Sequence, residues 1–150
     1  MTKKLDVDAF LKQKKLAVVG VSRQMNKTGN VIYRTLKKSG YQVFPVNPFM
    51  ETFDGDRCYP DLKSLPEPVT GVVIVIPPEQ VEKVLKDAAA ANIPFVWLQL
   101  KAGSDAAVQF CRENNMTVVS GECIFMFIEP VTSVHKFHRW LWKIFGKLPK

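Results

Sequence analysis

Residues 16–30 read LAVVGVSRQMNKTGN, and this stretch decides the fold. Its first four residues form an apolar run without in/out alternation, which is typical of a strand buried on both faces. Gly20 follows the run directly, and a helical pattern begins at Thr28. A strand, a glycine turn and a helix in this order predict the first βαβ unit of a parallel sheet.

Four further apolar runs, mostly β-branched, follow this stretch at regular distances along the chain. They occupy residues 43–46, 72–76, 95–98 and, more weakly, 117–119. None of them shows the alternation of a half-exposed strand, so each is expected inside a sheet covered on both faces. Together with the first run they predict five parallel strands.

Three amphipathic helical patterns separate these runs, at residues 28–39, 79–91 and 104–114. Gly40 is a natural stop for the first helix, and Ser104 is a suitable N-cap for the third. Strands that alternate with helices imply right-handed crossovers. The expected fold class is therefore α/β, a three-layer, Rossmann-like, doubly wound five-stranded parallel sheet in the order 3-2-1-4-5.

The segment 47–68 departs from that alternation, because its four prolines and Gly55 prevent a long helix. We expect a loop there, with at most a short helix near residues 61–65. Loops of this length in compact domains are often functional.

The glycine turn has the chemistry of an anion site. Gly20 allows a sharp bend, and Ser22 is small enough for a ligand to approach the backbone closely. Free N–H groups at the start of the following helix favour a phosphate, and Arg23 and Lys27 add positive charge. Because the turn ends a central strand, we expect it to lie beside the point where ligands bind in doubly wound sheets.

The ends of the next two strands narrow the choice of ligand. Dinucleotide enzymes that prefer NAD usually carry an acid at the end of the second strand, whereas this strand ends in Asn47 and Pro48. The third strand ends in Ile76-Pro77-Pro78, which is read either as a rigid apolar lip suited to an adenine ring or a pantetheine arm, or as a helix entry with Pro at its first position. NAD is therefore disfavoured.

These residues resemble a known family, the small single-domain CoA-binding proteins, which are related to the CoA-binding domain of the succinyl-CoA synthetase alpha subunit. The likeness is carried by AVVGVSRQMNKTGNVIYRTLKKSGYQVFPVNP, CYPDLKSLPEPVTGVVIVIPPEQV and FVWLQL, within residues 14–123. It implies one domain over residues 1–150, with coenzyme A or acyl-CoA as the ligand. The binding residues expected from the turn and the resemblance together are Gly20, Val21, Ser22, Arg23, Lys27, Gly29, Asn47, Pro48, Ile76, Pro77 and Gln99.

One departure from the family pattern follows Gln99. Relatives often have glycine soon after this position, whereas this chain continues Leu100-Lys101-Ala102-Gly103. The departure leaves the contact of the fourth-strand loop with the ligand open.

The C-terminal segment is a second candidate functional region. Residues 130–150 carry five of the basic residues and no acid, out of a net charge of +7. Residues 132–145 predict an amphipathic helix, read as a terminal helix packed on the domain or as a surface for a protein partner or self-association. A membrane surface is a less favoured partner for it, and nucleic acid is not expected because no recognition motif accompanies the charge.

Other chemistry finds little support in the sequence. Cys58, Cys111 and Cys123 are widely spaced, which predicts reduced thiols and no zinc site. His135 and His138 lack a nearby acid or thiol, so no catalytic constellation is evident. With no secretory signal or long apolar run, a cytoplasmic protein is expected.

We therefore expect a protein that binds CoA or acyl-CoA without catalysis of its own. Two alternatives stay open at this stage. One is an NAD(P)-dependent oxidoreductase on the same fold, and the other is an interaction protein that acts through its basic C-terminal helix.

Overall fold

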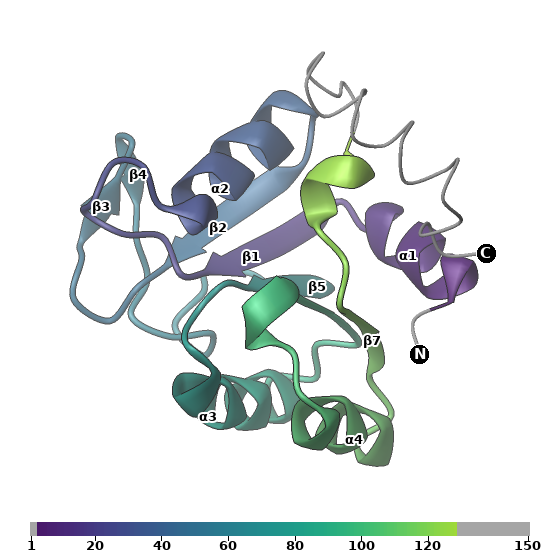
Figure 1. The fold of residues 1–150 in the computed structure, drawn as a ribbon. Helices are drawn as coiled ribbons and strands as arrows, with labels where there is room; N and C mark the ends of the chain where they lie inside the picture. The colour runs from purple at the N-terminus through teal and green to yellow at the C-terminus, as the bar shows by residue number, and fades with distance from the viewer. Residues whose placement is uncertain (1–2, 129–150) are drawn as a thin grey trace.

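The computed structural model describes residues 3–128, and this part contains the predicted parallel sheet (Figure 1). Each predicted apolar run forms a strand of it, within one or two residues at either end. The strands are β1 (Lys15–Val19), β2 (Gln42–Val46), β5 (Gly71–Ile74), β6 (Phe95–Leu98) and β7 (Thr117–Ser120).

The three predicted helices are also present, and a fourth precedes them. Ser104 caps its helix as expected, since its Oγ accepts a hydrogen bond from the N–H of Ala107 at 3.1 Å. Gly40 follows the end of the first predicted helix with a φ of +96°. The helices are α1 (Lys4–Leu11), α2 (Thr28–Lys38), α3 (Pro78–Ala90) and α4 (Asp105–Glu113), with short 3₁₀ turns η1 (Leu100–Ala102) and η2 (Ile124–Met126).

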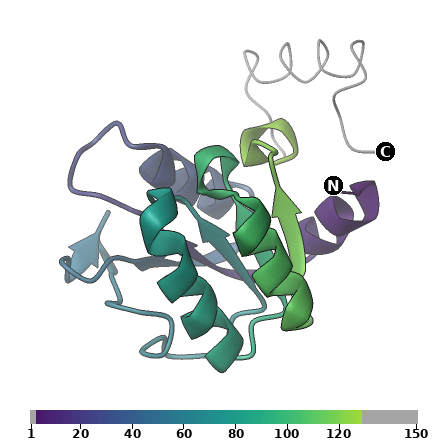
Figure 2. The ribbon, with the colours of Figure 1, turned by 60° about the horizontal axis from the view of Figure 1, so that its bottom comes forward.

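The helices cover both faces of the sheet, which gives the predicted three layers. Helices α3 and α4 lie side by side on one face, while α1 and α2 cover the other (Figures 1 and 2). Successive residues of a strand alternate between the two cores: Leu16 and Val18 pack toward α2, and Ala17 and Val19 pack toward α3. This explains why the strands are uniformly apolar, because neither face meets water.

The strand order differs from the predicted one. The observed order is β2-β1-β5-β6-β7, so the third parallel strand lies on the opposite side of β1 from β2. The predicted order, 3-2-1-4-5, is therefore wrong. Strand β2 lies at the edge, where Pro45 is tolerated because an edge strand does not need every N–H for pairing, whereas β5 is buried throughout. The chain reverses direction across the sheet between β1 and β5, which is the topological switch point.

The segment between β2 and β5 forms a small hairpin and no helix. Its strands, β3 (Thr52–Phe53) and β4 (Asp56–Arg57), are joined by Asp54 and Gly55, both with positive φ. An Asp-Gly pair is a strong signal for such a two-residue turn, so the sequence contained the information that the loop prediction missed. The hairpin packs on α2, where the ring of Phe53 lies 5.2 Å from that of Tyr33.

Helix α1 was not predicted, although it contributes to the core beside β6. Phe10 is fully buried, and its ring meets the ring of Trp97 edge to face at 5.3 Å. The predicted C-terminal helix over residues 132–145, together with the basic segment 130–150, His135 and His138, lies outside the described residues. In the part of the chain that the structure describes, no helix has the length and apolar character to cross a lipid bilayer.

Candidate functional site

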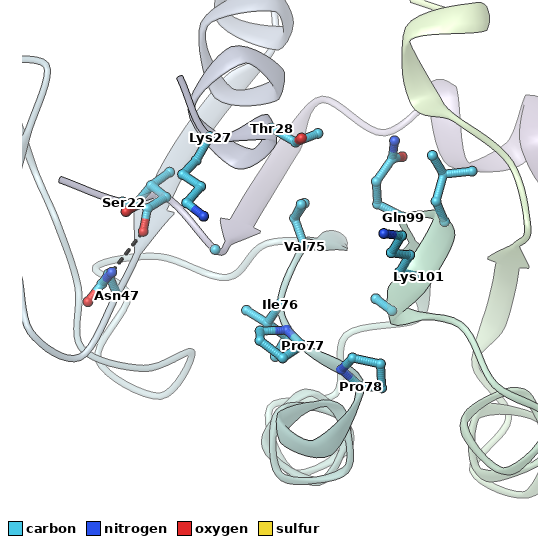
Figure 3. Close-up of a pocket in the computed structure, with 14 residues that line it drawn as sticks. Ser22, Lys27, Thr28, Asn47, Val75, Ile76, Pro77, Pro78, Gln99 and Lys101 are labelled. Carbon is cyan, nitrogen blue, oxygen red and sulfur yellow. Dashed lines mark hydrogen bonds between the residues drawn. The ribbon is translucent and has the colours of Figure 1, made fainter. Parts of the chain in front are cut away.

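A cavity of about 570 Å³ opens at the carboxyl ends of the central strands, at the switch point (Figure 3). Its volume lies within the range of small-molecule sites in proteins. The wall comes from four chain segments, which follow β1, β2, β5 and β6. It is formed by Gly20, Val21, Ser22, Lys27, Thr28, Asn47, Val75, Ile76, Pro77, Pro78, Gln99, Leu100, Lys101 and Ala102.

Glycine is required at two points where the turn after β1 packs against neighbouring backbone. Gly20 has a φ of +127°, and a Cβ there would lie 2.1 Å from the carbonyl oxygen of Val75. A Cβ on Gly29 would lie 2.3 Å from the carbonyl oxygen of Gly20. The turn is therefore pressed between β5 and the first turn of α2, which brings the start of α2 close to the cavity.

Asn30 holds the turn together from inside α2. Its side chain is 1% exposed and makes three hydrogen bonds. Its Oδ1 accepts from the N–H of Ser22 at 2.7 Å, while its Nδ2 donates to the carbonyls of Ser22 and Gln24, each at 2.9 Å. The turn is thus held in shape by hydrogen bonds within the protein.

Several backbone N–H groups of the turn after β1 are already bonded within the protein, so fewer of them can bind an anion than the sequence predicts. The N–H groups of Gly20, Ser22, Gln24 and Lys27 all donate within the protein. Those of Thr28 and Gly29, in the first turn of α2, have no acceptor among residues 3–128. The amides that remain for an anion therefore include those at the start of the helix, where its dipole favours negative charge, and that of Val21 in the cavity wall.

The two cations predicted at the turn differ in position. Lys27 lies at the N-cap position of α2, and its ammonium group points into the cavity (Figure 3). Arg23 donates instead to the carbonyl oxygen of Phe49 at 2.5 Å and does not line the cavity. The guanidinium of Arg23 thus joins two loops, and the role of Arg23 at an anion stays a prediction.

Asn47 lines the cavity, but its side chain is largely occupied by the protein. Its Nδ2 donates to the carbonyl of Val21 at 2.7 Å (Figure 3). Its Oδ1 accepts from the N–H of Phe49 at 2.8 Å. It therefore links the loop after β2 to the turn after β1. The next residue, Pro48, lies in the wall of a separate surface hollow.

The opposite wall is apolar near β5 and polar near β6. Val75, Ile76 and Pro77 offer hydrocarbon surface where the chain enters α3. Gln99 is 4% exposed, and its Oε1 accepts from the N–H of Ile124 at 3.0 Å, while its Nε2 lies 3.2 Å from Sγ of Cys123. Gln99 thus positions the end of β6 as Asn30 positions the turn after β1.

Of the eleven residues expected at the site, the structure brings all except Arg23, Gly29 and Pro48 into the cavity wall. Sequence reasoning missed part of the wall after β6, including Lys101. The signal that would have found it is positional: the loop after the fourth predicted strand must lie at the same edge of a parallel sheet as the glycine turn. The other wall residues that it missed are Thr28, Val75, Pro78, Leu100 and Ala102.

The described cysteines are free thiols, and two of them are buried. Burial raises the pKa of the Cys111 thiol to about 11, and it also raises the pKa of Cys58. Both thiols are therefore protonated and unreactive at neutral pH. Within residues 3–128, His, Cys, Asp and Glu side chains form no group of three that could hold a metal ion.

A glycine turn, a helix start and a cavity at the switch point are features of Rossmann-like α/β proteins, in which ligands bind at this place. Residues 14–129 match the family described as CoA binding domain, and the chain belongs to that family. The resemblance seen in the sequence is thereby confirmed.

Similar proteins include both small proteins and segments of larger ones. The uncharacterized protein YneT of Bacillus subtilis is 27% identical over 113 residues, covering 75% of this chain and 84% of that protein. The acetate–CoA ligase [ADP-forming] II subunit alpha of Pyrococcus furiosus is 32% identical over 129 residues, covering 79% of this chain but only 28% of the subunit. The chain thus corresponds to a fraction of the ligase subunit and to most of the small protein.

Solved structures agree with the fold. A conserved hypothetical protein from Pyrococcus furiosus superposes with a TM-score of 0.70 at 34% identity, covering 74% of this chain and 96% of that one. A hypothetical protein from Pyrococcus horikoshii gives a TM-score of 0.76 at 26% identity, covering 83% and 87% respectively.

Proposed function

We propose that this protein binds coenzyme A or an acyl-CoA in the cavity at the carboxyl end of the sheet, and that it catalyses no reaction of its own. The observation that carries the proposal is the coincidence of the CoA-binding family with a cavity at the switch point whose wall includes Lys27 and the start of α2. In this arrangement a phosphate of the ligand meets the N–H group of Thr28, at the start of α2, and the ammonium group of Lys27.

The apolar part of the wall suits the rest of the same ligand. Val75, Ile76 and Pro77 lie between the segments that follow β1 and β6. Hydrocarbon surface of this kind stabilises a bound pantetheine arm by removing it from water. Asn47 adds little direct recognition, because its side chain already bonds to the loops on either side.

The wall also supports a binding role without catalysis. In the described part of the chain, the residues around the cavity include no carboxylate, imidazole or thiol. The wall therefore lacks the carboxylate, imidazole and thiol groups that act as general bases in many enzymes, and its ionisable side chains are those of Lys27 and Lys101. The ligase activity named for the Pyrococcus relative belongs to a subunit of which this chain covers only 28%, so we assign none of that reaction here.

An NAD(P)-dependent oxidoreductase is the weaker alternative. The end of β2 carries Asn47 and Pro48 where such enzymes usually place an acid that binds the ribose. The other alternative, an interaction protein acting through residues 132–145, depends on a segment outside the described residues.

Calorimetric titration with CoA, acetyl-CoA, ADP and NAD tests the proposal. We expect CoA and acetyl-CoA to bind more tightly than ADP, and NAD to give no measurable heat. Lys27→Ala should weaken CoA binding by about 10- to 100-fold, the value of one charged hydrogen bond. Lys38→Ala is the matched control, since it removes the same charge from the far, exposed end of α2. Absence of heat with CoA and acetyl-CoA, or tight NAD binding, would overturn the proposal.

A further inference from the structure

The cavity contains a second cation that the proposed site does not use. We propose that Lys101 binds a second anionic group of the ligand, separate from the phosphate at Lys27, and that it thereby determines which CoA derivatives this protein prefers. The inference rests on the proposed function and extends it to a specificity residue. The class of ligand is a CoA compound whose 3′-phosphate or acyl carboxylate reaches the segment after β6.

The two lysines approach the cavity from opposite sides. Lys27 follows β1 and Lys101 follows β6, and β5 lies between these strands in the sheet. Two strand spacings separate β1 from β6 by roughly 10 Å. Figure 3 shows the side-chain nitrogens of both lysines directed into the space beside Val75. One phosphate at the start of α2 is therefore poorly placed to satisfy both.

Among the described residues, the cavity wall carries two positive side chains and no negative one. Lys27 and Lys101 are both exposed, and neither forms an ion pair within residues 3–128. The wall contains no acid. Two cations that face one cavity repel each other. Negative groups bound in the cavity are attracted to both lysines, and this attraction offsets the repulsion. The cavity wall is thus electrostatically complementary to a ligand with more than one negative group.

The backbone that carries Lys101 is held in place. The turn closes through hydrogen bonds from the N–H of Ala102 to the carbonyl of Gln99 at 2.9 Å and from the N–H of Gly103 to that of Leu100 at 3.1 Å. A Cβ on Gly103 would lie 2.2 Å from Oγ of Ser120, so the turn is pressed against the end of β7. Gln99, buried and bonded to the segment after β7, fixes the start of the turn.

The apolar surface between the two lysines sets how far apart the two anionic groups of the ligand must lie. Val75, Ile76 and Pro77 supply no charged group between the two ends of the cavity. The ligand must therefore carry an uncharged portion between its anionic groups. CoA meets this requirement in two ways: the ribose separates its diphosphate from the 3′-phosphate, and the pantetheine separates the diphosphate from the acyl group.

The experiment compares ligands that differ by one anionic group. The wild-type protein, Lys101→Ala and Lys27→Ala are titrated with CoA, dephospho-CoA, acetyl-CoA, succinyl-CoA and ADP. Lys83→Ala is the matched control, because Lys83 is exposed on α3 and does not line the cavity. Lys101→Arg keeps the charge and is expected to keep most of the affinity.

We expect Lys101→Ala to weaken binding selectively by about 10-fold. A loss for CoA but not for dephospho-CoA assigns the 3′-phosphate, and a loss for succinyl-CoA but not for acetyl-CoA assigns an acyl carboxylate. Equal losses for all ligands, or no loss for any while wild-type protein binds CoA, would overturn the inference and leave the proposed function standing. Failure of the wild-type protein to bind any CoA compound would remove the proposed function itself.

Discussion

Two turns border the cavity, and each is organised by one buried amide side chain. Asn30 and Gln99 are the buried polar residues of the described chain, at 1% and 4% exposure. Asn30 supports the turn after β1 through three hydrogen bonds, whereas Gln99 supports the turn after β6 through contacts with Cys123 and Ile124. A buried amide must find partners, so both residues are strongly constrained.

The difference between the turns lies in where these bonds go. Asn30 bonds within its own turn, and its Oδ1 occupies the N–H of Ser22, which a phosphate would otherwise use. Gln99 bonds away from the cavity, toward the segment after β7, and leaves Lys101 directed inward. The turn after β1 therefore supplies shape, a helix start and the charge of Lys27, while the turn after β6 supplies the charge of Lys101. Rigid support and ligand contact are divided between different residues.

The largest expected effect comes from breaking the first turn at its tightest point. Gly20→Ala places a methyl group against the carbonyl of Val75 at a φ of +127°. We expect a loss of about 3 kcal/mol or more in the free energy of unfolding, because overpacking and backbone strain add. Urea denaturation measures it. Gly121→Ala is the control, since it also has positive φ but open space around it, and should cost only about 1 kcal/mol. Similar losses in both variants would contradict the packing argument.

Removing the amide of the first turn should have the next largest effect. Asn30→Ala leaves one N–H and two carbonyl groups without their partner, which should destabilise the fold by about 2–3 kcal/mol. Asn30→Asp keeps an acceptor for the N–H of Ser22 but loses both donated bonds. Its stability in the same denaturation assay should lie between those of wild type and Asn30→Ala. An alanine variant as stable as wild type would show that water replaces these bonds.

The corresponding change in the second turn should cost less, because Gln99 makes fewer bonds. We expect Gln99→Ala to destabilise the protein by about 1–2 kcal/mol, mainly through the unsatisfied N–H of Ile124. Gln109→Ala, on the exposed surface of α4, is the control and should change stability by less than about 0.5 kcal/mol. Thermal unfolding measures both. A cost above that of Asn30→Ala would reverse the comparison of the two turns.

The smallest expected change in stability comes from the contact between the β3–β4 hairpin and α2, on the side of α2 away from the cavity. Asp56 accepts hydrogen bonds from Lys37 and, to a smaller effect, from Tyr33, and these hold the pKa of its carboxyl below the ordinary value of 3.8. Its contribution is therefore complete above that pH and is lost as the pH falls through the lowered pKa. Because the side chain of Asp56 is 38% exposed, solvent screening keeps this contribution below about 1 kcal/mol.

Melting temperatures recorded from pH 7 down to pH 2.5 measure this contribution. Asp56→Asn should be less stable than wild type at pH 7, and the gap should close at the acid end of the range. Asp8→Asn, on the exposed surface of α1, should follow the wild-type curve. A gap between wild type and Asp56→Asn that stays constant down to pH 2.5 would contradict the role of the ionised carboxylate.

Much of the architecture could be predicted because it depends on local pattern. Five β-branched runs without alternation specify buried parallel strands, and Ser104 and Gly40 mark helix ends through interactions within a few residues. Two elements were missed for local reasons as well. The Asp54-Gly55 hairpin carried a recognisable turn signal, and α1 shows Val7 and Phe10 at helical spacing.

The strand order and the division of labour at the site were decided only by tertiary contacts. The sequence by itself determined the α/β class, the family and a glycine turn with a lysine at the start of a helix. Three contacts are visible only in the folded chain. Arg23 bonds to the carbonyl of Phe49, and Asn30 accepts a hydrogen bond from the N–H of Ser22. Lys101 lies across the cavity from Lys27. Periodicity is a property of neighbouring residues, whereas these contacts join residues that come together only once the strands are paired and the helices packed.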